Sequence, residues 1–124
     1  MITSVQFEPV NITDVCKIIT TEKTYELAIN NIQHCCESWK IRLYTEDGVK
    51  ICNEVVGAIV FEVIDYDLNK FKNVPAWIPA MHADDMYVVF FRTSGICFYM
   101  IAQVYHGGYY PHDITFDVYQ TITD

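Results

Sequence analysis

Residues 86–105 hold the feature that most constrains the fold, two runs that are apolar at nearly every position. Val, Ile, Phe and Tyr dominate both runs, and Thr93, Ser94 and Gly95 separate them in a short segment typical of a turn. This pattern predicts a β-hairpin. A strand buried on one face alternates, whereas a continuous apolar run indicates that both faces are covered. We therefore expect the hairpin to supply central strands of a sheet, with a second layer on one face and another subunit on the other.

Other segments rich in β-forming residues predict further strands. They cover residues 4–9 (an edge strand stopped by Pro9), 17–19 after a turn at 11–16, 24–29, 38–44, 58–65 and 114–119. Residues 49–56 are expected to form a short helix with Gly57 at its end. Residues 66–79 form the longest irregular segment. The predicted fold class is α+β, a mainly antiparallel β-sheet with one or two short helices, in a single ligand-binding domain over residues 1–124.

The bulk composition limits the class of partner. A chain of 124 residues that is 52% hydrophobic is long enough to bury a core. The net charge of −8 argues against DNA and against membrane surfaces, because both are polyanionic. It still allows a small anionic ligand held by one or two arginines. No apolar run approaches the roughly 20 residues of a membrane span. Without a signal-peptide pattern at the start, we expect a cytoplasmic protein.

The sequence offers no complete catalytic or metal-binding pattern. His82, Asp84 and Asp85 look like a metal cluster, but neighbouring positions of an extended segment point to opposite sides and no second set completes it. The five cysteines include an adjacent pair at Cys35 and Cys36, which suits free thiols in a reducing cytosol. No paired carboxylates, activated serine, phosphate loop or dinucleotide fingerprint is found. We therefore expect no enzyme activity, no metal and no cofactor.

The remaining features are typical of a binding pocket. Aromatic rings stack on nucleobases, which is worth about 1–3 kcal/mol per base, arginine grips phosphate in a bidentate fork, and glycine allows close approach to the backbone. The candidate binding residues are Arg92, His106, Gly108, Tyr109, Tyr110, Trp77 and Phe71. For Arg92 the structural alternative is an ion pair with an acidic neighbour such as Asp85. Lys40 and Arg42 are second candidates for phosphate, and the alternative is that they solubilise an exposed sheet face.

Three short motifs resemble those of a phage and prophage protein family of unknown function. Residues 31–37 (Asn-Ile-Gln-His-Cys-Cys-Glu) are similar to its His-Glu-Gln-Asp-Cys-Cys-Glu motif and lack its His and Asp. Residues 107–111 (Gly-Gly-Tyr-Tyr-Pro) are similar to its Asn-Gly-Tyr-Tyr-Ser motif, and residues 55–59 to its Leu-Ile-Gly-x-Pro-Ile junction. The likeness covers most of residues 24–118. In size and character the chain further resembles the Thoeris anti-defence sponge proteins of phages.

The second resemblance implies a function. Those proteins bind cyclic ADP-ribose isomers made by bacterial immune enzymes, sequester them without cleavage, and assemble as homodimers or higher oligomers. In this chain Arg92 would hold the diphosphate, Tyr109 and Tyr110 would shape the pocket, and Trp77 or Phe71 would stack on adenine. Two alternatives stay open. One is an enzyme that degrades a cyclic nucleotide signal, and the other is an acidic inhibitor that binds a host defence protein.

Overall fold

Nine strands form two antiparallel sheets in the computed structural model, which describes residues 1–10, 13–30, 38–66, 74–105 and 113–122. The four-stranded sheet has the order β1-β2-β3-β9 and the five-stranded sheet the order β5-β4-β8-β7-β6. The strands of the first are β1 (Ile2–Val10), β2 (Thr13–Thr20), β3 (Lys23–Asn30) and β9 (Ile114–Gln120). Those of the second are β4 (Ser38–Thr45), β5 (Lys50–Ile51), β6 (Val60–Tyr66), β7 (Asp85–Thr93) and β8 (Phe98–Tyr105).

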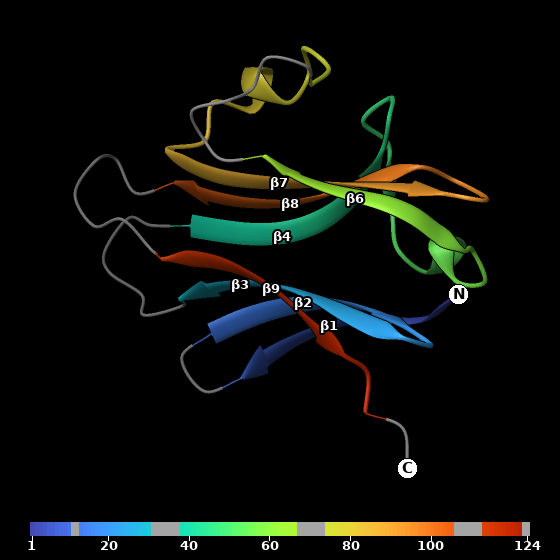
Figure 1. Cartoon of the computed structure of the whole chain (residues 1–124). Helices are drawn as coiled ribbons and strands as arrows, with labels where there is room; N and C mark the ends of the chain where they lie inside the picture. Colours follow the sequence, from blue (N-terminus) through green and yellow to red (C-terminus); the bar gives the residue numbers. More distant parts are fainter. Residues whose placement is uncertain (11–12, 31–37, 67–73, 106–112, 123–124) are drawn as a thin grey trace.

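The two sheets stack face to face as a β-sandwich, as the two layers in Figure 1 show. The core between them is built from alternate residues of the facing strands. Phe91 of β7 stacks on Phe98 of β8 with ring centroids 4.7 Å apart, and Tyr25 of β3 meets Phe91 edge-on at 5.2 Å. These rings join the two sheets directly. Each fully buried side chain of this size contributes about 1.5–3 kcal/mol of hydrophobic stabilisation.

The hairpin prediction is confirmed, since β7 and β8 pair along their length and β8 is the middle strand of its sheet. One face of the hairpin lies in the sandwich core. The other face is covered by residues 74–84 of the same chain, which we call the covering segment. Contact with another subunit stays a prediction. This segment carries the 3₁₀ turn Pro79–Met81 and lies beyond the five-stranded sheet in Figure 1 (yellow). Both faces of β8 are therefore buried within one chain.

The covering segment is fastened to the sheet by a polar network as well as by apolar contacts. Gln103, only 2% exposed, donates from Nε2 to the Tyr105 hydroxyl (3.1 Å) and to Met81 Sδ (3.0 Å). The Tyr105 hydroxyl donates in turn to the Met81 carbonyl (3.1 Å). Because a buried amide without partners costs about 1–3 kcal/mol, this network favours one position of the segment over the sheet.

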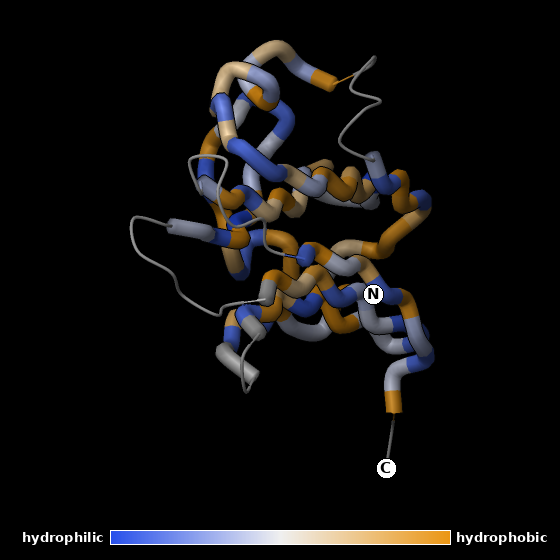
Figure 2. The backbone as a smooth tube through the Cα atoms, turned by 90° about the vertical axis from the view of Figure 1, so that its left-hand side faces the viewer, coloured by the Kyte–Doolittle hydropathy of each residue, from blue (hydrophilic) through white to orange (hydrophobic). Residues whose placement is uncertain are grey.

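The outer face of the four-stranded sheet differs, because its residues are mostly polar and open to solvent. Lys17 of β2 lies 3.4 Å from Glu8 and 3.7 Å from Glu26, and the Tyr119 hydroxyl donates to Glu26. Seen from the side in Figure 2, the strands change repeatedly between apolar and polar residues along their length. This alternation is the pattern expected of strands with one buried face.

The mainly antiparallel sheet is confirmed, whereas the predicted short helices are wrong for the described residues. Residues 49–56 form the two-residue strand β5 and a 3₁₀ turn, Asn53–Val55, in place of a helix. Cys52 supplies no side-chain cap, and the Glu54 carboxylate accepts a hydrogen bond from the Cys52 amide, which satisfies the backbone locally. Gly57 follows this turn with a positive φ of 96°. The protein is therefore a β-sandwich with isolated 3₁₀ turns.

The other strand predictions are confirmed with shifted bounds. The turn predicted at residues 11–16 is wrong for its described part, because β2 already begins at Thr13 and pairs with both of its neighbours. β1 is an edge strand as expected, but it continues through Pro9 to Val10, since an edge strand tolerates a residue without an N–H. β6 begins two residues later than predicted and is also an edge strand.

Candidate functional site

Arg92, the first candidate for phosphate, lies at the surface of β7. The β6–β7 register places Glu62 directly opposite it, and Arg92 Nε is 3.2 Å from Glu62 Oε2. The guanidinium also lies over the Phe61 ring, 5.5 Å from its centroid. About half of each charged side chain is exposed. The acidic partner of Arg92 is thus Glu62 and not Asp85, because Asp85 begins β7 at the opposite end of the strand.

Trp77, the predicted stacking residue, lies in the covering segment. Its ring packs against Tyr44 (5.5 Å between centroids) and edge-on against Tyr99 (5.8 Å), and its Nε1 donates to the Glu46 carbonyl. The indole therefore has a structural role, fixing the covering segment and the β4–β5 turn over the sheet. Trp77 and Arg92 lie above the same outer sheet face but contact different neighbours.

The other predicted site residues, Phe71, His106, Gly108, Tyr109 and Tyr110, lie outside the described residues, as do Cys35 and Cys36. Whether they join Arg92 or Trp77 in one pocket stays a prediction.

Lys40 and Arg42 lie where the alternation of β4 predicts, on the outer face, while Ile41 and Leu43 pack toward the core. Lys50 joins them from β5, because the register pairs it with Tyr44, two residues beyond Arg42. β5 pairs with β4 at Leu43 and Tyr44, so in the described ranges the first part of β4 has no strand paired to that side. Three basic side chains thus gather at the β4–β5 edge of the sandwich.

This edge is hollowed where β1 approaches β4. One hollow of about 300 Å³ is lined by Phe7, Glu8, Asp14, Val15, Lys40 and Ile41. An adjoining hollow of about 270 Å³ is lined by Phe7, Ile41, Arg42, Leu43, Lys50, Ile51 and Cys52. The two share Phe7 and Ile41, and we call them together the β1–β4 groove. Phe7 is 45% exposed between them.

The cations of the β1–β4 groove differ from Lys17 and Arg92 in their partners. Within the described ranges, no carboxylate lies in ion-pair distance of Lys40, Arg42 or Lys50. The acidic neighbours in the groove are engaged elsewhere, since Glu8 pairs with Lys17 and Asp14 accepts a hydrogen bond from the Trp39 indole. Burial raises the pKa of Tyr44 above its ordinary value, and the adjacent Arg42 offsets part of that rise by charge and hydrogen bonding.

The arrangement suits an anionic ligand with a planar group. Lys and Arg side chains without a carboxylate partner can bind phosphate oxygens through charge-assisted hydrogen bonds, and an exposed aromatic ring offers a face for stacking. Sequence reasoning did not single out Phe7 or Lys50. The sequence does contain hints of both positions. Phe7 is an apolar residue in the alternating pattern of a predicted edge strand, and Lys50 follows the turn at 46–48 and pairs with the end of β4.

Burial raises the pKa of the Cys16 thiol far above its ordinary value, which keeps it protonated. Among the described residues no group of three or more His, Cys, Asp and Glu side chains is placed to hold a metal ion. No helix in these ranges is long and apolar enough to cross a membrane.

Comparison of the chain with protein-family models, with curated proteins and with solved structures finds no match.

Proposed function

We propose that this protein is a phage anti-defence protein that binds a cyclic ADP-ribose-type immune signal and sequesters it without cleavage, which blocks Thoeris signalling. The observation that carries the binding proposal is the set of three cations at the β1–β4 groove, Lys40, Arg42 and Lys50, which have no carboxylate partner among the described residues. In a chain of net charge −8, such a group of cations favours a bound anion. The identity of the signal rests on the sequence resemblance.

Each side chain of the groove has a role in this proposal. Arg42 and Lys50 line the same hollow and would hold one phosphate, and Lys40 in the adjoining hollow would hold the second. Phe7 borders both hollows and would stack on the base. Arg92, which sequence reasoning placed on the diphosphate, would have to leave Glu62 and Phe61 first. The β1–β4 groove therefore needs less rearrangement than a site built on Arg92.

Assembly as a homodimer or higher oligomer in the cytoplasm of the infected host is part of the proposal. It rests on the resemblance alone, because the covering segment already buries much of the outer face of the hairpin.

Calorimetric titration of the purified protein with a cyclic ADP-ribose isomer tests the proposal. After titration the complex is heated to release the ligand, and the supernatant is chromatographed. We expect saturable heat and the return of unchanged ligand. Recovery of a converted product would replace the sponge with the alternative enzyme. Absence of binding to any cyclic ADP-ribose isomer would overturn the small-molecule function and favour an inhibitor that acts on a host protein.

A further inference from the structure

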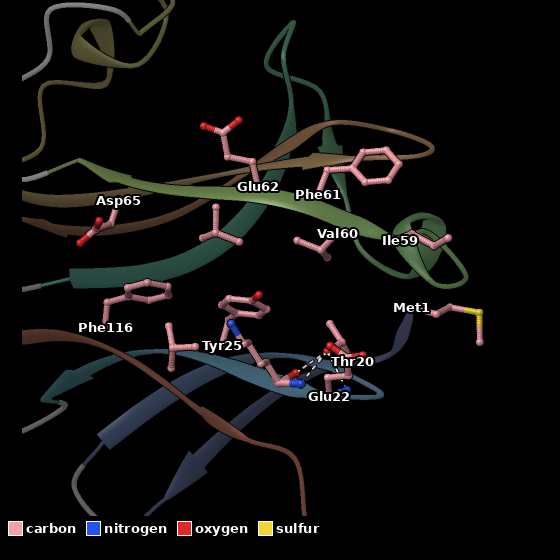
Figure 3. Close-up of a pocket in the computed structure, with 13 residues that line it drawn as sticks. Met1, Thr20, Glu22, Tyr25, Ile59, Val60, Phe61, Glu62, Asp65 and Phe116 are labelled. Carbon is pink, nitrogen blue, oxygen red and sulfur yellow. Dashed lines mark hydrogen bonds between the residues drawn. The ribbon is translucent and has the colours of Figure 1, made fainter.

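A second groove lies on the other side of the sandwich, and the proposed function does not use it. It has a volume of about 700 Å³ and runs between β6 of one sheet and β3 and β9 of the other; we call it the β6–β9 groove. Tyr25 and Phe116 lie between the layers from below, and Val60 faces them from β6, as Figure 3 shows. Apolar side chains thus form part of the lining of this groove, beside charged and polar ones.

Both margins of the β6–β9 groove are edge strands. β6 ends the five-stranded sheet and β9 ends the four-stranded sheet, so each has an outward side with no strand paired to it in the described ranges. Large apolar side chains are exposed along these margins, namely Ile59 (52%), Phe61 (55%) and Val118 (48%). An open strand edge flanked by exposed apolar side chains is a template for another chain. The β4 edge lacks this character, because its outer face carries Lys40 and Arg42.

The charges around the groove indicate which kind of chain fits. Its charged side chains comprise three carboxylates, Glu22, Glu62 and Asp65, and one cation, Lys23. Asp65 extends from β6 toward the lower sheet next to Phe116, whereas Glu62 points out over the rim (Figure 3). The rim already holds one guanidinium, since Arg92 lies 3.2 Å from Glu62 and over the Phe61 ring. An aromatic face beside a carboxylate is a combination that binds arginine.

We propose that the β6–β9 groove docks an extended, basic segment of a partner protein by adding it as a strand to the β6 edge. Main-chain hydrogen bonds to the open edge would supply affinity, and alternate side chains would supply specificity. Apolar residues of the segment pack on Ile59, Phe61 and Val118, while its Arg or Lys residues reach Asp65 and Glu22. The groove lies opposite the β1–β4 groove in strand order, so a peptide and an anionic ligand can be bound together.

The test uses the full chain and a synthetic eight-residue peptide of alternating Arg and Val, labelled for fluorescence anisotropy. The matched peptides carry Glu or Gln in place of Arg. We expect the Arg peptide to bind, and the Glu peptide to bind at least tenfold more weakly. The double variant Glu22→Gln with Asp65→Asn keeps the side-chain shapes and is expected to weaken Arg-peptide binding about tenfold. Lys40→Ala on the opposite side serves as the control, with affinity unchanged.

Hydrogen exchange of the complex locates the peptide. Added protection at β6 amides, with little change at β4, is the expected result. The proposal is overturned if the Arg peptide does not bind, if the Glu peptide binds equally well, or if the double variant binds like the wild type. A concentration-dependent dimer that protects β6 and excludes the peptide would also overturn it, because the occupant would then be a second copy of this chain.

Discussion

The two open sides of the sandwich share one scaffold and differ in chemistry. On the β1–β4 side, Lys40, Arg42 and Lys50 line hollows beside a single exposed aromatic ring. On the β6–β9 side, three carboxylates and several apolar side chains line a larger groove between two strands that are sheet edges in the described ranges. In strand order these sides are the two ends of the same two sheets. The difference therefore arises from the outward residues of the edge strands, while the core residues between the sheets are common to both.

This difference separates two kinds of partner. The basic side suits a small anion. Its charges also disfavour strand pairing at the β4 edge. If β4 paired with β4 of another copy in an antiparallel register centred on Ile41, Lys40 would lie opposite Arg42. The β6 edge lacks such a pair of like charges about its midpoint, Val63, where Glu62 would face Ile64. One side is thus protected against strand addition and the other is open to it.

A matched pair of glycine variants should lower the free energy of unfolding more at the β4–β5 turn than at the turn before β6. Gly48 and Gly57 both have positive φ, 84° and 96°, so alanine is strained at either position by about 1–2 kcal/mol. At Gly48 an added Cβ would also lie 3.1 Å from Trp77 Cδ2, in a ring already packed on Tyr44 and Tyr99, whereas nothing lies within 4 Å at Gly57. We expect Gly48→Ala to cost about 3 kcal/mol of unfolding free energy and Gly57→Ala about 1 kcal/mol.

Chemical denaturation of both variants measures the difference. Equal losses at the two positions would show that Trp77 does not hold the β4–β5 turn.

Arg42→Ala tests the basic side directly. If its guanidinium binds a phosphate, its removal should weaken ligand binding by about 2 kcal/mol, or roughly thirtyfold. Isothermal titration calorimetry gives the affinity, and circular dichroism confirms that the variant is folded. Lys23→Ala is the matched control, because Lys23 is a cation of the opposite groove, and its affinity should equal that of the wild type. If Lys23→Ala abolished ligand binding and Arg42→Ala left it unchanged, the anionic ligand would be assigned to the β6–β9 groove and not to the β1–β4 groove.

Arg92→Ala has the smallest expected effect. It distinguishes a phosphate site at Arg92 from one at Lys40, Arg42 and Lys50. The exposed Arg92–Glu62 pair contributes less than about 1 kcal/mol to stability, and we expect ligand affinity within about twofold of wild type. A loss of roughly 2 kcal/mol in a folded variant would instead place the phosphate on Arg92, as the sequence predicted. Glu62→Gln, which frees the guanidinium, provides the comparison in the same titration.

Strand positions were predictable because apolar and alternating runs record burial directly. The continuous apolar hairpin correctly indicated two covered faces, and the alternation in residues 38–44 correctly placed Lys40 and Arg42 on the outer face of β4. The identity of the second cover was not predictable. Residues 74–84 have no strong hydrophobic periodicity. Ile78 and Met81 reach the sheet through the 3₁₀ turn Pro79–Met81, which the apolar pattern does not predict.

The short helix was predicted wrongly for a physical reason. Apolar spacing in residues 49–56 fits a helical turn, but Val49, Val55 and Val56 are β-branched and Cys52 is a poor cap. Pairing of Lys50 and Ile51 with β4 then stabilises a strand.

The site was harder to predict than the fold. Arg92 stood out because it interrupts an apolar run, but its ion-pair partner depends on the β6–β7 register, which a single strand does not encode. Likewise Phe7 and Lys50 line one hollow from strands that are distant in sequence.

Amide chemical-shift mapping by nuclear magnetic resonance, with a cyclic ADP-ribose isomer added to labelled protein, tests the central claim most directly. We predict shifts that saturate together in β1 around Phe7, in β4 from Lys40 to Arg42, and in β5 at Lys50, with β6 and β9 unchanged. Shifts confined to β6, β7 around Arg92 and β9 would contradict the assignment of the anion to the basic side.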